Sequence, residues 1–168
     1  MRSPRSAAAA TAVAVAALLA LAAQAFGLPP FSTAAKTSPG SGGQAQLSGI
    51  AVGCHATFDR FVIGISSGNP GYDVRFVSRI VADPSGNPVS LRGSKRIRVV
   101  VHPARGHTTA GANLLPATLT PLCPNLRQVK RAGDFEGVVS FGLGLAHKTG
   151  FRVFRLTGPS RIVIDVAH

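Results

Sequence analysis

The C-terminal part of the chain, residues 130–168, consists mainly of short apolar runs separated by breaks that contain glycine and proline. The runs occupy residues 137–145, 151–156 and 161–166. Strands of about five or six residues between such breaks are typical of antiparallel β domains. In the last run Ile162, Ile164 and Val166 alternate with other residues, and this period of two predicts a strand with one buried face. The pattern favours an all-β fold over a helical one.

The same pattern continues toward the N-terminus. Four more apolar runs of strand length occupy residues 50–54, 60–65, 74–81 and 95–101. A strong turn signal at residues 83–88 separates the last two of these runs and would allow them to pair. Two stretches are less regular. Residues 103–124 are expected to form a long loop, with or without a helical turn, and residues 126–132 are expected to form a strand or a short helix. With 19 Gly and 12 Pro, the chain suits a turn-rich antiparallel β domain better than a helical bundle.

Three segments of different composition predict the domain organisation. Residues 1–25 carry Arg2 and Arg5, then an apolar run, then a small-residue end, which is the arrangement of a secretory signal peptide. An uncleaved membrane anchor is the alternative, although alanine is only weakly apolar and no basic cluster follows. Residues 26–47 are rich in Pro, Ser, Thr, Gly and Ala and are expected to form a flexible linker. Residues 48–168 are expected to form the folded domain.

The charge of the chain is strongly positive. Lys and Arg total 18 against 6 acidic residues, a formal net charge of +12. Loss of a leader that contains Arg2 and Arg5 would lower the net charge by two, from +12 to about +10. This balance favours a polyanionic partner or polyanionic surroundings without identifying the polyanion.

Cys54 and Cys123 are the two cysteines of the chain. Behind an export signal, an even number of cysteines predicts a disulfide, and closing a loop of this length stabilises a fold by roughly 2–5 kcal/mol. Two buried free thiols are the alternative.

Four arginines are the candidate binding residues. If runs 74–81 and 95–101 pair, their non-core faces carry the following cationic strip: Arg75, Arg79, Arg96 and Arg98. Guanidinium groups bind carboxylates and phosphates in bidentate fashion, so the strip fits an anionic envelope polymer. A solvated sheet face is the alternative. Tyr72, in the preceding turn, either stacks on a sugar or covers the core.

The run 137–145 has one face that is nearly bare of side chains. Its apolar positions alternate with Ser140, Gly142 and Gly144. This face would admit a glycan or a neighbouring backbone, or it would mark close strand packing or a bulge.

Other titratable residues offer weaker candidates. Three histidines could hold zinc in a metal-assisted hydrolase, but their spacing matches no metal motif: His55, His102 and His107. Loop histidines bonded to backbone groups are the alternative, and no metal or cofactor is expected.

The neighbours Asp134 and Glu136 could be a carboxylate pair for glycoside hydrolysis, but an Asp between a glycine and a strand usually closes a turn. Two more acids are expected in structural ion pairs or turn bonds, Asp59 beside Arg60 and Asp165 near Arg161.

Several stretches carry a resemblance to a known family. They are residues 133–145, 150–154 and 159–166, with 55–62, 70–72 and 83–86 upstream. Together they resemble the AMIN-like domain of actinobacterial secreted proteins, a relative of the AMIN domain of cell-wall amidases and pilus secretins. The resemblance implies a β-sandwich that targets or binds the cell envelope, and it implies no catalytic residues.

These observations predict a non-catalytic module, secreted or associated with the cell envelope, that contacts a cell-wall glycan or another anionic envelope polymer through a basic face. A protein–protein adaptor that uses a free sheet edge is the main alternative. The zinc hydrolase is a second alternative. Nucleic-acid binding is disfavoured because export removes the chain from nucleic acid and few aromatic platforms are present. Contact with a membrane is expected only through an uncleaved leader.

Overall fold

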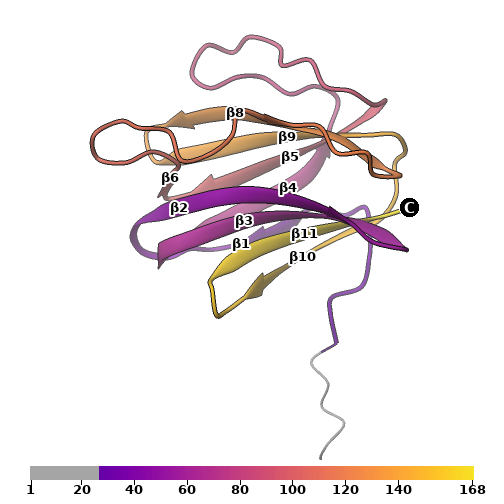
Figure 1. Ribbon diagram of the computed structural model, residues 1–168, viewed down its shortest axis with the longest axis horizontal. Coiled ribbons are helices and arrows are strands. Elements are labelled where there is room, and N and C mark those ends of the chain that lie inside the picture. Colours follow the sequence, from indigo (N-terminus) through magenta and orange to yellow (C-terminus); the bar gives the residue numbers. More distant parts are fainter. Residues whose placement is uncertain (1–26) are drawn as a thin grey trace, which may run out of the picture.

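The computed structural model describes residues 27–168, so the signal peptide predicted at residues 1–25 lies outside the described part of the chain. The described residues form two β-sheets packed face to face, as Figure 1 shows. This arrangement confirms the predicted β-sandwich. Within residues 27–168 there is no helix, and hence none with the length and apolar character needed to cross a membrane.

One sheet has six strands in the spatial order β1-β4-β5-β9-β8-β7. Their bounds are β1 Lys36–Ser38, β4 Gly71–Val77, β5 Lys95–His102, β7 Thr118–Leu119, β8 Leu126–Phe135 and β9 Val138–Leu145. Every neighbouring pair in this sheet is antiparallel. The condition for a shared face of runs 74–81 and 95–101 is met, because β4 lies beside β5 with Val74 opposite Val99.

The other sheet has five strands in the order β10-β11-β3-β2-β6. Their bounds are β2 Ser41–Cys54, β3 Phe58–Asn69, β6 Ala104–Arg105, β10 Phe151–Leu156 and β11 Arg161–Ala167. The short strand β6 runs parallel to β2, and the other pairs are antiparallel.

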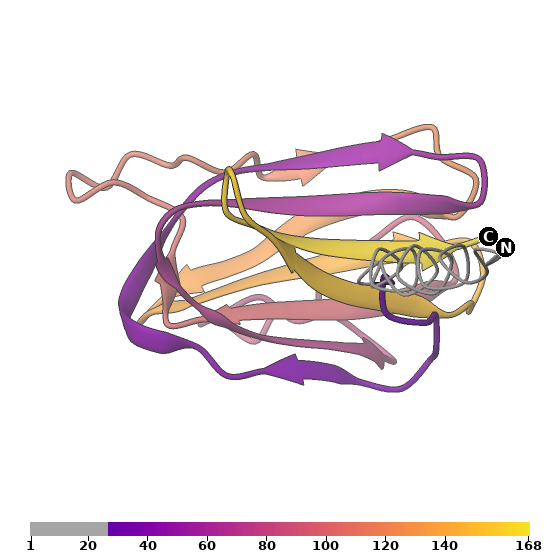
Figure 2. The ribbon, with the colours of Figure 1, turned by 90° about the horizontal axis from the view of Figure 1, so that it is seen from below.

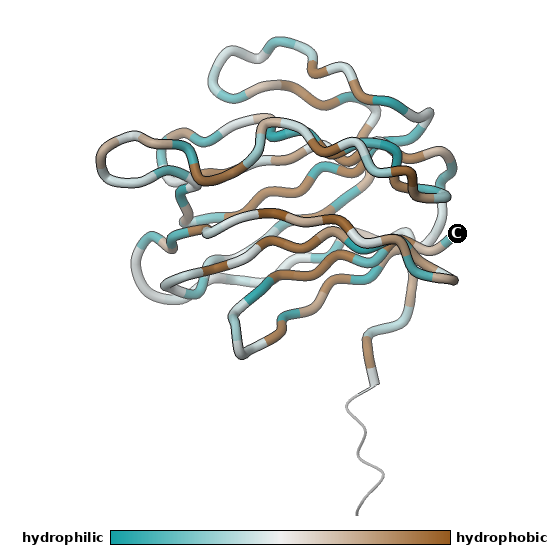
Figure 3. The backbone as a smooth tube through the Cα atoms, viewed as in Figure 1, coloured by the Kyte–Doolittle hydropathy of each residue, from teal (hydrophilic) through white to brown (hydrophobic). Residues whose placement is uncertain are grey.

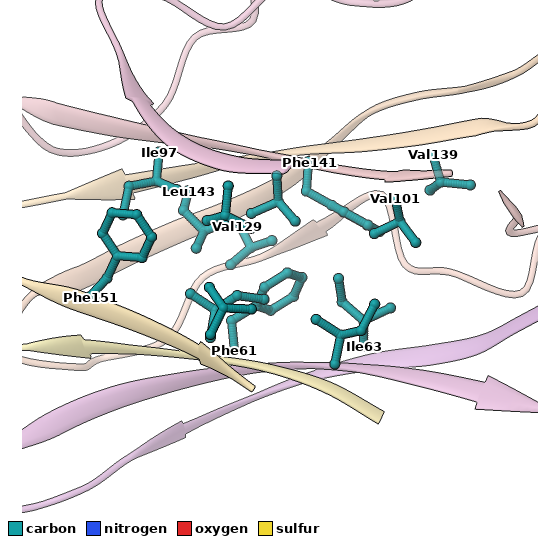
Figure 4. Packing of buried hydrophobic residues seen from close by; sticks show 14 of the residues in the cluster. Phe61, Ile63, Ile97, Val101, Val129, Val139, Phe141, Leu143 and Phe151 are labelled. Atoms are coloured by element: carbon teal, nitrogen blue, oxygen red, sulfur yellow. The ribbon is translucent and has the colours of Figure 1, made fainter. Parts of the chain in front are cut away.

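The core lies between the two sheets. Figure 4 shows side chains of both layers in contact, and the aromatic pair at the centre is Phe61 of β3 with Phe141 of β9, whose ring centroids are 5.5 Å apart in an edge-to-face arrangement. Alternate residues of each strand point inward, which is why apolar and polar segments alternate along the strands in Figure 3. The alternation recognised in the sequence therefore selects the core face correctly.

Three details differ from the sequence-based expectation. Strand β4 ends at Val77, so the predicted run 74–81 is too long and its last residues belong to a loop. Residues 126–132 form a strand, not a helix, as part of β8. The expected loop at 103–124 contains two two-residue strands, β6 and β7, and no helical turn.

The predicted flexible linker is wrong for residues 36–47. Strand β1 pairs with β4 at the edge of the six-stranded sheet, and the following strand β2 joins the five-stranded sheet, so this segment connects the two layers, as Figure 2 shows in indigo. Ala45 and Leu47 are fully buried. Small residues suggest a linker by composition, but here they allow close approach, since a Cβ on Gly40 would overlap the backbone of Gly71.

The predicted disulfide is confirmed. Cys54 at the end of β2 is bonded to Cys123, and the two residues are 69 positions apart in the sequence. The bond ties the five-stranded sheet to the segment that precedes β8.

Candidate functional site

The outer face of the six-stranded sheet is partly covered by residues 79–93, the covering loop, which lies above the sheet in Figure 1. Ile80 and Leu91 of this loop form a small second core with Ala132 of β8. A Cβ on Gly142 would overlap both loop side chains, and one on Gly144 would overlap the carbonyl of residue 92. The nearly bare face that the sequence showed in residues 137–145 is therefore where the covering loop of the same chain packs.

The four predicted arginines do not form a single strip. Arg75 of β4 lies directly opposite Arg98 of β5 on the outer face, and Arg96 lies on the same face, opposite Val77. Arg79 is exposed but belongs to the covering loop, because β4 ends two residues earlier.

Two of the predicted binding residues are already engaged elsewhere. The Arg75 guanidinium makes a two-bond ion pair with Asp73 on the same strand, and this hydrogen bonding raises the pKa of Arg75. Tyr72 packs against the core on the inner face, with the Arg155 guanidinium 5.4 Å from its ring centroid. Tyr72 thus covers the core and lies on the opposite side of the sheet from the arginines.

Arg96 instead lines a cavity of about 460 Å³ where β4 ends and β5 begins, called here the cationic cavity. Its lining is Phe76, Val77, Ser78, Ser94, Lys95, Arg96 and Lys148. The two serines flank the covering loop, and Lys148 comes from the turn between β9 and β10. Segments far apart in the sequence therefore supply the positive charges of this cavity.

The electrostatics of the cationic cavity are one-sided. Lys95, Arg96 and Lys148 line it, and no acidic residue does. Within residues 27–168 none of these three cations lies within ion-pair distance of a carboxylate. The Lys148 ammonium lies 5.3 Å from the centroid of the Phe76 ring, which places an aromatic surface beside the charge. The arrangement can hold a carboxylate or phosphate together with a small apolar or sugar face.

A second group of arginines lies on the outer face of the five-stranded sheet, and the sequence analysis did not identify it. Asp165 of β11 is fully buried and accepts hydrogen bonds from Arg60 of β3 (Nε to Oδ1, 2.6 Å) and from Arg152 of β10 (Nε to Oδ2, 2.9 Å). These three residues are directly opposite one another on adjacent strands. Both guanidinium groups stack on the rings of Phe58 and Phe154.

The Arg60–Asp165–Arg152 triad is a structural network. The hydrogen bond from Arg60 to Asp165 raises the pKa of the Arg60 guanidinium, whereas partial burial acts to lower it. The expected partner of Asp165 was Arg161, but Arg161 donates to the carbonyl of Pro159 instead. Alternation along a single strand could not reveal the triad, because its members come from three strands.

The comparison with family models covers most of the described chain. The model of the AMIN-like domain matches residues 45–168. The chain belongs to the AMIN-like domain family. A search of the curated proteins finds no match. The match begins within β2 of this AMIN-like domain and includes both sheets except β1.

The histidines of the AMIN-like domain do not assemble a metal site. His55 stacks on Phe58, with ring centroids 4.5 Å apart, and His107 bonds to Asp134, with Nδ1 2.9 Å from Oδ2. Within residues 27–168 one group of three potential ligand residues has its atoms within 4.8 Å of one another, and it consists of Cys54, Asp59 and Cys123. Because the two sulfurs are bonded to each other, this group is a disulfide beside a carboxylate.

The other acids have structural roles, but their partners are distant in sequence, whereas local turn bonds or a pair with Arg60 were expected. Asp59 accepts backbone N–H bonds from Asn125 and Leu126, both at 2.7 Å. Asp134 accepts the backbone N–H of Gly106 at 3.1 Å. Asp134 is therefore occupied, and Glu136 lines a separate cavity, whose lining also includes Asp83.

Proposed function

We propose that the protein is an exported, non-catalytic module that binds an anionic polymer of the cell envelope, and that the cationic cavity is its contact site. Membership of the AMIN-like family supports the envelope role, since AMIN-like domains are targeting modules. The disulfide fits a location outside the cytoplasm. The leader at residues 1–25 would deliver the chain there, and a short segment after it would tether the domain.

The observation that carries the proposal is the contrast between charge and pairing in the cationic cavity. Lys95, Arg96 and Lys148 line one hollow with no carboxylate partner within ion-pair distance in the described residues. Holding like charges together without a partner is unfavourable, and an anionic ligand relieves the repulsion. Phosphates and carboxylates repeated along a wall polymer would bind with gains from multivalency.

The direct test is a sedimentation assay with purified cell walls over a salt series. The full protein is compared with a variant that carries Lys95→Gln, Arg96→Gln and Lys148→Gln. Exposed ion pairs contribute about 0.5 kcal/mol each, so loss of three should weaken retention about tenfold at low salt. Retention of the unmodified protein should decrease as the salt concentration increases.

The matched control removes the same number of charges elsewhere. Arg79, Arg127 and Arg161 lie outside the lining of the cationic cavity, are not in ion pairs within residues 27–168, and are replaced by Gln. Retention close to that of the unmodified protein is expected. Equal weakening in the two triple variants would show that diffuse basicity, and not this cavity, binds the wall.

The adaptor alternative has less support from the sheet edges. The edge strands β1, β6 and β7 have three, two and two residues, which is short for the addition of a partner strand. The remaining edge strand, β10, already pairs in part with Ser32 through two backbone hydrogen bonds. Retention of the protein on envelope proteins but not on purified walls would favour the adaptor.

A further inference from the structure

A second cavity, of about 510 Å³, opens at the other end of the outer face of β5 and has a different chemistry. It is lined by Asp83, Pro84, Arg98, Val100, Phe135, Glu136 and Val138, and is called here the mixed-charge cavity. Arg98 and Arg96 are two positions apart on one face of β5, so the two cavities lie along the same strand, roughly 7 Å apart at these residues.

The two carboxylates of this cavity are exceptional in the chain. Of the 6 acidic residues, the other four are within ion-pair distance of a base: Asp59, Asp73, Asp134 and Asp165. Asp83 bonds instead to the hydroxyl of Ser140, with Oγ 2.8 Å from Oδ2, and Glu136 makes no side-chain hydrogen bond to the rest of residues 27–168. Although cations greatly outnumber acids in this domain, the mixed-charge cavity thus contains two carboxylates without a cationic partner.

Both carboxylates are held on fixed backbone. The Asp83 N–H donates to the carbonyl of Ala132 at 2.9 Å, which anchors this end of the covering loop on β8. Glu136 occupies the two-residue turn between β8 and β9 with a φ of 48°, and its neighbour Gly137 accepts the N–H of Ala104 at 2.8 Å. A non-glycine residue in this left-handed region is uncommon. The backbone that carries the two acidic side chains is therefore fixed before any ligand arrives.

The remaining walls supply an apolar surface and one cation. Phe135 is 46% exposed, which is unusual for so large an apolar side chain, and Val100 and Val138 are only half-buried. Arg98 lines the same cavity, yet it is not within ion-pair distance of Asp83 or Glu136. The lining thus combines an apolar surface with negative and positive groups that are not paired with each other.

From this juxtaposition we infer that the mixed-charge cavity binds an amino-acid-type zwitterion: a primary ammonium group on an alkyl stem that also carries a carboxylate. The ammonium donates to Asp83 and Glu136, the stem lies on Phe135 and the valines, and the carboxylate accepts from Arg98. The inference is independent of the cationic cavity, which has no acidic lining and would repel an ammonium.

The test uses the full protein and Nα-acetyl-L-lysine, which has one free ammonium and one carboxylate, followed by NMR of the backbone amides. Saturable shifts are expected at Phe135, Glu136 and Val138. Nα,Nε-diacetyl-L-lysine, which lacks the ammonium, should bind about tenfold more weakly, as expected for loss of a charge-assisted hydrogen bond. Nα-acetyl-L-lysine methyl ester should bind more weakly as well, because it lacks the carboxylate.

Two variants assign the charges. Glu136→Gln keeps the size of the side chain and should weaken the binding of Nα-acetyl-L-lysine about tenfold. Arg98→Gln should weaken the binding of Nα-acetyl-L-lysine but leave the binding of its methyl ester unchanged. Asp73→Asn is the matched control, because Asp73 is an acid of the neighbouring strand that is paired with Arg75, and it should leave binding unchanged.

Three results would overturn the inference: no saturable shift, equal binding of the diacetyl probe, or equal losses in Glu136→Gln and Asp73→Asn. The Lys95/Arg96/Lys148 variant should bind the probe like the unmodified protein. If this variant binds Nα-acetyl-L-lysine but is no longer retained on cell walls, the two sites are separate. If the unmodified protein is retained on cell walls but does not bind Nα-acetyl-L-lysine, only the present inference is wrong.

Discussion

The two sheets present arginines on their outer faces in opposite states. On the five-stranded sheet, Arg60 and Arg152 share the fully buried Asp165 and stack on aromatic rings. On the six-stranded sheet, Arg96 shares a cavity with two lysines and has no carboxylate partner in the described chain. The residue type is the same, but the first group is paired within the fold, whereas Arg96 has no such partner in residues 27–168.

The contrast shows why a net charge alone does not locate a binding site. Three of the arginines in residues 27–168 form ion pairs with acids of the same chain: Arg75 with Asp73, and Arg60 and Arg152 with the shared Asp165. Arg75 lies on the same face as Arg96 but carries no free charge for a ligand. The position of the acids, more than the position of the arginines, therefore defines the candidate site. Four predictions probe this difference.

The largest effect is expected from Asp165→Ala, which leaves two partly buried guanidinium groups without their carboxylate. Loss of one member of a buried ion pair typically costs 3–5 kcal/mol, and because Arg60 and Arg152 are partly exposed we expect about 3 kcal/mol. Urea unfolding followed by circular dichroism measures it. Wall retention of the folded fraction should be unchanged.

A second variant sharpens this prediction. Replacing the whole triad by apolar residues, Arg60→Met, Arg152→Met and Asp165→Val, removes the unpaired charges and should restore stability to within about 1 kcal/mol of the unmodified protein. If the triple variant were as unstable as Asp165→Ala, packing and not charge compensation would be the reason for the loss.

The next effect is expected from Gly144→Ala beneath the covering loop. The added Cβ overlaps the carbonyl of Arg92, so the loop has to shift, at a cost of about 1–3 kcal/mol. Since Ser78 and Ser94 flank this loop and line the cationic cavity, wall retention should fall as well. Gly49→Ala is the control, because nothing lies within 4 Å of its added Cβ. Equal unfolding midpoints for the two variants would refute the role of the covering loop.

A smaller effect on stability is expected from the Lys95→Gln, Arg96→Gln, Lys148→Gln variant. These side chains have no ion-pair partner in residues 27–168, so the free energy of unfolding should change by less than about 0.5 kcal/mol per residue, and loss of their mutual repulsion could raise it slightly. Thermal and urea unfolding measure it. A loss comparable with that of Asp165→Ala would mean that the cationic cavity is a structural network after all.

The smallest effect is expected from salt on the triad. Between about 0.1 and 1 M NaCl the stability difference between the unmodified protein and Asp165→Ala should change by less than about 0.5 kcal/mol, because a buried pair is screened much less than exposed charges. Wall retention should be lost over the same range. A triad whose contribution disappears in salt would be an ordinary surface ion pair.

Much of the fold could be predicted from the sequence. The alternation in residues 161–166 selects the buried face of β11, and the turn at 83–88 allows the pairing of β4 with β5, because each signal is local. The disulfide follows from the number of cysteines and the expected export. Strand β1 and the first half of β2 were missed, because Gly, Ser and Gln carry no apolar period, and backbone pairing with β4 and β3 holds these segments in place.

The candidate site could be predicted only in part. Arg96 and Arg98 were identified from their outward positions on β5, whereas Lys148 was not, because it reaches the cationic cavity from another strand connection. Tyr72 packs against the core, which agrees with one of the two interpretations that its position in a turn left open. The covering loop was recognised as a turn but not as the segment that fills the space above Gly142 and Gly144.

The sequence by itself determined that this chain forms strands, which face of each is apolar, and that positive charges greatly outnumber negative ones. Only the tertiary structure decided which of those charges are paired. Arg60 and Asp165 are 105 residues apart in sequence, and they meet because β3 lies beside β11 in one particular register. The side-chain period depends on the nearest residues along the strand, whereas an ion pair depends on which strands become neighbours.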